Sequence, residues 1–205
     1  MRKSFFQRNY NITIRLTLLG AISYLLGIVS SLLNQELDNI DIAKLKDYLI
    51  FIQDKLATIE HFAKFLAVIS MIVAVLLIVV ELIQRFFKDS VWNYFKSVYQ
   101  TVRLRQFLRQ DEKSKSVITI DSQTTVTKYN PILKTFNKAV SKCTVDVRKD
   151  YVTVFIRYPK TQQAQKLLRD MEAHVKEEVS SRNPDYYFSS PSRDGNRLWF
   201  VGTRR

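Results

Sequence analysis

Two long apolar stretches dominate the first half of this chain of 205 residues, at positions 16–33 and 62–83. A helix crosses the hydrocarbon core of a bilayer with about 20 apolar residues, because its backbone polar groups are satisfied within the segment. The first stretch carries no charge, and the charges of the second, Lys64 and Glu81, lie near its ends. The pattern predicts two transmembrane helices, the first following a basic N-terminus within residues 1–33 and the second at 62–84.

The charges that flank these stretches predict the orientation. Residues 1–15 hold four basic residues and no acid, and residues 85–115 hold eight against three acids, whereas residues 34–60 hold six acids against three lysines. Basic flanks stay on the cytoplasmic side of a membrane. We therefore expect a multi-pass protein of the bacterial cell (inner) membrane with cytoplasmic N- and C-termini. A cleavable signal peptide is the alternative for the first stretch, but no small-x-small cleavage site follows Leu33.

Both predicted spans carry small residues at steps of three and four. In lipid, helices associate where small side chains let their backbones approach closely. The pattern predicts close helix packing, within one chain or between copies, through Gly20, Ser23, Gly27, Ser30, Ala67, Ser70 and Ala74.

The predicted extracytoplasmic loop, residues 34–61, has helical periodicity of its own. Its apolar residues follow the a/d spacing of a coiled coil. These are Ile42, Leu45, Leu49, Ile52, Leu56 and Ile59. The seam predicts one helix that runs from about residue 41 into the second span, and it favours a homo-oligomer. Alternatively, the seam packs on the first part of the loop itself, at 37–40.

The sequence predicts a basic, aromatic juxtamembrane helix and a linker at residues 85–116. Trp92, Tyr94 and Tyr99 lie beside an apolar stripe, and arginines cluster near the end of the helix. Aromatic and basic residues at this place fit either a helix at the level of the lipid headgroups or a cytoplasmic stalk.

Residues 117–205 predict a small cytoplasmic α+β domain with the order ββ-α-ββ-α-ββ. Asn130 and Pro131 form a helix start, with a capping side chain before a proline at the first helical position. Pro159 ends a strand, and Thr161 can cap the helix that follows. The predicted strands are 117–121, 125–129, 143–148, 151–158, 186–189 and 197–203, and the predicted helices are 131–140 and 162–182.

The net charge of +13 favours anionic partners. Within 117–205, 16 basic residues stand against nine acids. Aromatic and basic residues on an open sheet face can stack on bases and neutralise phosphates. The predicted nucleic-acid or anion-binding residues are Phe155, Arg157, Arg193, Arg197, Trp199, Arg204 and Arg205. An anionic membrane leaflet would favour the same composition.

Enzyme motifs are absent from the sequence. The four glycines form no phosphate-cradling loop. One cysteine and two histidines form neither a disulfide nor a common zinc site. Cys143 with His174 is a weak nucleophile–base pair, and Arg169 with His174 has the spacing of HEPN ribonucleases, whose domains are all-helical. We expect no catalytic residue, no cofactor and no metal.

The layout of two spans, a short outer loop and a small cytoplasmic domain resembles the N-terminal membrane portion of FtsK/SpoIIIE-type conjugative coupling proteins of Gram-positive elements, without the ATPase. The resemblance implies a role in plasmid conjugation, and no functional residue is carried over from it. The leading hypothesis is a non-enzymatic, oligomerising inner-membrane scaffold that recruits a partner, such as DNA or a membrane-associated DNA-processing complex. The alternative is a two-span effector that forms a pore when its cytoplasmic domain binds a ligand or partner.

Overall fold

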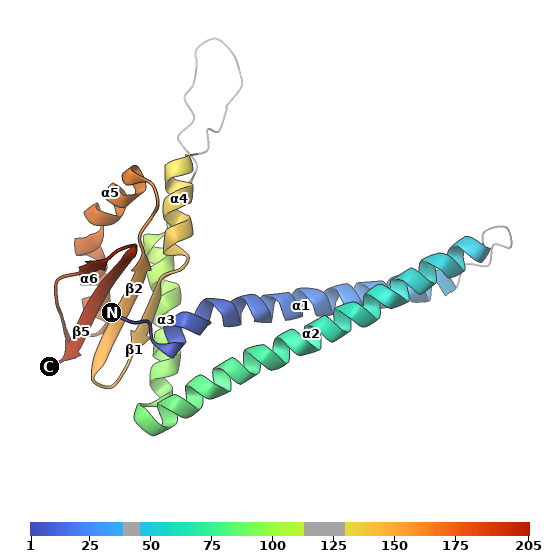
Figure 1. The fold of residues 1–205 in the computed structure, drawn as a ribbon, viewed down its shortest axis with the longest axis horizontal. Coiled ribbons are helices and arrows are strands. Elements are labelled where there is room, and N and C mark those ends of the chain that lie inside the picture. Colours follow the sequence, from blue (N-terminus) through green and yellow to red (C-terminus); the bar gives the residue numbers. More distant parts are fainter. Residues whose placement is uncertain (39–45, 113–129) are drawn as a thin grey trace, which may run out of the picture. The chain divides into compact units, whose positions relative to one another are not determined.

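The computed structural model describes residues 1–38, 46–112 and 130–205 (Figure 1). These residues form two compact units. The helical unit is Arg8–Glu81, and the sheet unit combines Met1–Gln7 with Leu82–Arg205. The sheet unit is therefore larger than the α+β domain predicted at 117–205, because it also includes the first residues of the chain and those that follow the second apolar stretch.

Two long apolar helices, α1 (Phe5–Asp38) and α2 (Lys46–Lys88), contain the predicted spans. Both are long and apolar enough to cross a membrane, and only 22% of the most apolar window of each is buried within the molecule. A core helix of a soluble protein would be mostly buried. The beginning of the predicted outer helix, near residue 41, lies outside the described residues.

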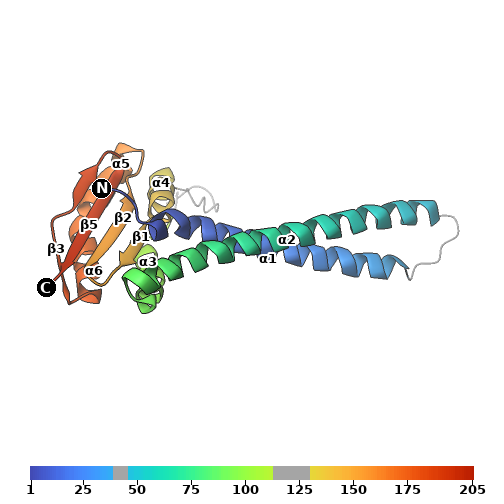
Figure 2. The same cartoon turned by 60° about the horizontal axis from the view of Figure 1, so that its bottom comes forward.

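The sheet unit contains four further helices and an antiparallel sheet. In chain order these are α3 (Val91–Leu108), α4 (Pro131–Val140), β1 (Thr144–Val147), β2 (Tyr151–Arg157), α5 (Gln162–Asp170), α6 (Glu172–Arg182), β3 (Tyr186–Phe188), β4 (Ser192–Asp194) and β5 (Arg197–Arg204). Strands β1, β2, β5 and β3 are adjacent in that order, and β4 also pairs with β5 (Figure 2). The strands predicted at 117–121 and 125–129 lie outside the described residues.

The hydrophobic core lies between one face of this sheet and the helices. Val152, Val154 and Ile156 alternate along β2 and are fully buried, as β-strand geometry requires for residues that share a face. Phe136 of α4 and Leu168 of α5 belong to the same cluster.

Local sequence signals explain where some helices start, but not where all of them end. Asn130 accepts a hydrogen bond from the Ile132 N–H at 3.0 Å, so the predicted cap of α4 is confirmed. Thr161 holds the N-cap position of α5 without a side-chain capping bond. The single helix predicted at 162–182 is wrong, because the chain breaks at Met171 into α5 and α6. No glycine or proline marks this break in the sequence.

Helix α3 covers the outer edge of β1. The Thr101 hydroxyl accepts from the Val145 N–H at 2.9 Å, and the Ser97 hydroxyl accepts from the Val147 N–H at 2.9 Å. Arg105 Nη2 donates to the Cys143 carbonyl oxygen at 2.7 Å. The three side chains are spaced four residues apart on α3, and their partners are spaced two residues apart, at positions 147, 145 and 143. Helix α3 therefore satisfies backbone groups that an exposed sheet edge would leave without partners. Helix α3 is thus an integral element of the sheet unit.

Candidate nucleic-acid interface

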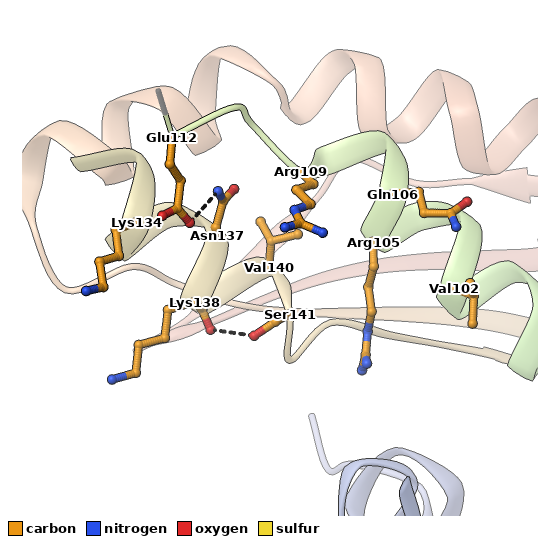
Figure 3. Close-up of a pocket in the computed structure, with 10 residues that line it drawn as sticks. All are labelled: Val102, Arg105, Gln106, Arg109, Glu112, Lys134, Asn137, Lys138, Val140 and Ser141. Atoms are coloured by element: carbon orange, nitrogen blue, oxygen red, sulfur yellow. Dashed lines mark hydrogen bonds between the residues drawn. The ribbon is translucent and has the colours of Figure 1, made fainter. Parts of the chain in front are cut away.

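A groove of about 550 Å³ separates the end of α3 from α4 (Figure 3). Four cationic side chains line it, with Arg105 and Arg109 coming from α3 and its C-cap and Lys134 and Lys138 from α4. Lys134 and Lys138 are one turn apart and extend in the same direction. Among the described residues of the lining, Glu112 is the only acid, and it accepts a hydrogen bond from the Asn137 amide at 3.0 Å.

A second pocket of about 450 Å³ shares Lys138 with this groove. It also contains Lys142, Arg157 and Lys160, and no acid is present among the residues that the structure describes in its lining. The uncapped Thr161 at the start of α5 lines it as well. Grouping like charges raises the electrostatic free energy of the protein, and a bound anion lowers it. We call the two pockets together the α4 basic surface.

The aromatic pair predicted for base stacking lies on the sheet face opposite the core. The Phe155 and Trp199 ring centroids are 5.1 Å apart in an edge-to-face arrangement. Both side chains are nevertheless buried, with exposed fractions of 3% and 1%. Lys3 Nζ lies 3.6 Å from the Phe155 ring centroid, and the Gln7 amide donates to the Thr153 carbonyl oxygen at 3.2 Å. The expected open face is therefore covered by the first residues of the chain, so in this structure the pair is not accessible to a base.

The predicted arginines occupy different places. Arg157 and Arg197 are directly opposite each other on β2 and β5. Burial lowers the pKa of Lys3, and the nearby charges of Arg197, Arg157 and Lys142 lower it further. The Lys3 amine thus lies near Arg157 and Lys142 of the α4 basic surface and adds to its positive charge.

The remaining predicted arginines lie apart from this group. The Arg193 guanidinium lies 4.1 Å from the Tyr158 ring centroid and donates to the Gly195 carbonyl oxygen. Arg204 and Arg205 are exposed at the end of β5.

Sequence reasoning missed most of the α4 basic surface. Its cations come from α3 and its C-cap, from α4 and the α4–β1 connection, and from the end of β2 and the β2–α5 connection, and only the fold brings these segments together. One signal was available, since Lys134 and Lys138 are four residues apart and therefore share a face of the predicted helix at 131–140.

The small residues of the two spans gather inside the helical unit. All seven predicted positions are buried. A Cβ atom added at Gly20 would lie 2.8 Å from Ser70 Oγ, which shows how closely α1 and α2 approach. On the outer part of α2, Ile52 and Ile59 of the predicted seam are each 45% exposed, whereas Leu49 and Leu56 are half-buried. Ile42 and Leu45 lie outside the described residues.

The residues considered for catalysis do not assemble. Cys143 is fully buried, and this burial raises the pKa of its thiol to about 11, which disfavours the nucleophilic thiolate. Arg169 belongs to α5 whereas His174 belongs to α6, so the two are not on one helix. Among the described residues, no group of three acidic, histidine or cysteine side chains could hold a metal ion.

No family model, no curated protein and no solved structure matches this chain. Its function is therefore inferred from its own residues.

Proposed function

We propose that this chain is a non-enzymatic, two-span scaffold of the bacterial inner membrane that self-associates and holds a basic domain against DNA on the cytoplasmic side. Its partner would be DNA itself or a DNA-processing complex such as a conjugation apparatus. The observation that carries this proposal is the α4 basic surface, in which two adjoining pockets share Lys138 and together hold seven cationic side chains.

Phosphate neutralisation is the recognition mode that this surface supports. Lysine and arginine contacts to phosphates release counterions and bind DNA without reading its sequence. Base stacking is not needed in this scheme, and the covered Phe155 and Trp199 do not contribute to it. Duplex and single-stranded DNA should therefore both bind.

Two observations support a membrane protein with both termini on one side. The helices α1 and α2 are long and apolar, and little of either is buried. The first seven residues and residues 82–205 form one compact unit, which supports placing the start of the chain and its C-terminal domain in the same compartment. The basic flanks favour the cytoplasm for that compartment.

The pore-forming alternative gains no support from the helical unit. A pore would be lined by the small polar face of α1, but Ser23 and Ser30 are buried. Exposed Ile52 and Ile59 instead offer apolar surface for association between copies outside the membrane.

DNA binding by the full chain in phosphatidylcholine nanodiscs tests the proposal. Between 50 and 200 mM salt the affinity should fall steeply, and K134Q/K138Q should make the slope of log affinity against log salt shallower by about two. The matched control K149Q/K166Q removes two exposed lysines that line neither pocket and should leave most of the slope intact. Absence of binding at 50 mM salt, or equal slopes for both double variants, would refute the DNA proposal.

A further inference from the structure

Helix α3 has an exposed aromatic face opposite the face that holds β1. Trp92, Phe95 and Tyr99 are 66%, 55% and 55% exposed. They are spaced by three and four residues, so at 100° per residue they form one stripe. We call these three residues the aromatic stripe. On the same geometry, the buried residues Ser97 and Thr101 point to the other side of the helix.

Among the described residues, the contacts that hold α3 in the sheet unit come mainly from the side opposite this stripe. The buried side of α3 already supplies the contacts to β1 and to the core through Leu104 and Leu108. The Trp92 and Phe95 ring centroids are 6.1 Å apart, so they form one apolar surface. Phe86 and Phe87, at the end of α2, are 72% and 78% exposed and extend the aromatic character toward the span. Contiguous apolar surface of this kind marks a site of interaction with a partner or with lipid.

The chain keeps the stripe close to the predicted bilayer. Helix α2 ends at Lys88 and α3 begins at Val91. Trp92 is thus four residues beyond α2, which limits its backbone to about 14 Å from the helix end. The polar headgroup layer is about 5–8 Å thick on each side of the hydrocarbon core.

Charges border the stripe in the way an anionic lipid surface requires. Lys88, Lys96 and Arg103 flank it along the chain. Arg103 Nε donates to the Tyr99 hydroxyl at 3.2 Å, and its guanidinium lies 5.6 Å from the ring centroid. Amphipathic side chains of this type place their rings at the acyl boundary and their charges among the headgroups.

We propose that α3 lies in the headgroup region of the membrane, with Trp92, Phe95 and Tyr99 inserted at the acyl boundary. This inference rests on the membrane anchoring given under the proposed function, but not on DNA binding. Because the opposite face of α3 holds β1, insertion of the stripe sets the orientation of the sheet toward the bilayer. The partner of this surface is lipid rather than a second copy of the chain.

The two tryptophans of the chain allow a direct test. In W199F the only tryptophan is Trp92, which is exposed, and in W92F it is Trp199, which is 1% exposed. Excitation at wavelengths that tyrosine does not absorb restricts the emission to the tryptophan. Both full-length variants are incorporated into nanodiscs with and without phosphatidylcholine brominated at the 6,7 positions of one acyl chain. Bromolipid should reduce the Trp92 emission to half or less, and acrylamide should quench it weakly. Trp199 should respond little to either quencher.

Each other outcome overturns the proposal. Strong acrylamide quenching without bromolipid quenching would place the stripe in water. Protection from both quenchers would indicate a protein partner, including a second copy. Failure of the chain to remain in the nanodiscs would instead reject the membrane anchoring itself. If W199F does not fold, W92F/F95W moves the reporter one turn along the stripe while Trp199 is kept, and it should gain the bromolipid response that W92F lacks.

Discussion

At the scale of single residues, a buried ion pair joins α2 to β1 within the sheet unit. Arg85 and Asp146 are fully buried, and Arg85 Nη2 donates to Asp146 Oδ1 at 2.5 Å. Arg85 Nη1 also donates to the Val147 carbonyl oxygen at 3.0 Å, and the Phe6 ring lies 5.3 Å from the guanidinium. Removing one partner of such a pair leaves a desolvated charge, which costs more than the intact pair contributes.

D146N should therefore destabilise the sheet unit by about 3 kcal/mol. Native-state labelling of the buried Cys143 measures this, because the thiol reacts only when the unit opens, and the labelling rate should rise by about 100-fold. The apolar double variant R85M/D146L should label more slowly than D146N, since the fully buried Arg85 charge is removed together with its partner. Asp89, which loses its 3.5 Å contact to Arg85, keeps hydrogen bonds from the Asn93 amide and the Lys149 N–H. D150N, at an exposed carboxylate, is the control. Equal labelling rates for D146N and D150N would show that the pair is unimportant.

The Cys143 thiol predicts a pH dependence of stability. Burial raises its pKa from the ordinary value of 9.0 to about 11 in the folded protein. The unfolded chain then loses this proton at lower pH than the folded one, so stability is complete below pH 9 and falls between pH 9 and 11, by up to about 1.4 kcal/mol per pH unit. Urea unfolding in detergent at pH 8 to 11 should show a steeper loss for the unmodified chain than for C143S, which has no thiol to ionise. Parallel curves would contradict the burial of this thiol.

At the scale of elements, the sequence predicted those features that depend on residues close together in the chain, and not those that depend on contacts between distant segments. The start of α4 and the β1–β2 hairpin were predictable, because a capping residue and strand alternation act within a few positions. The role of α3 was not, since the partners of its Ser97 and Thr101 lie 50 and 44 residues further along the chain. Lys3, which covers Phe155, is even further from its partner in the sequence. Strand alternation alone therefore predicted that the Phe155 ring lies on an exposed sheet face.

The edge contacts of α3 give a prediction at this scale. S97A/T101V should destabilise the sheet unit by about 2–4 kcal/mol, because the Val145 and Val147 N–H groups would then be buried without acceptors. Cys143 labelling again measures the effect. The control T135V/S181A removes two hydroxyls that donate only to their own helices and should change the rate less than tenfold. Similar rates for both double variants would mean that α3 is held by its apolar contacts alone.

At the scale of the whole molecule, the two units have surfaces of different chemical character. The helical unit exposes apolar side chains along α1 and α2, which suits lipid, whereas the sheet unit carries the α4 basic surface, which suits anions. The chain enters the helical unit after Gln7 and leaves it before Leu82, and both of these residues belong to the sheet unit. A protein of this design brings a polyanion to the membrane only if the sheet unit faces the compartment that contains it.

That condition makes topology the decisive whole-molecule prediction. E36C, near the end of α1, should react with a membrane-impermeant maleimide on intact bacterial spheroplasts, because the acidic loop is expected outside. K166C, exposed on α5, should react only after permeabilisation. The unmodified chain is the blank, since its buried Cys143 should label little on either side and therefore cannot report the topology by itself. Labelling of K166C on intact spheroplasts would place the α4 basic surface outside the cell, where it would have no access to cytoplasmic DNA.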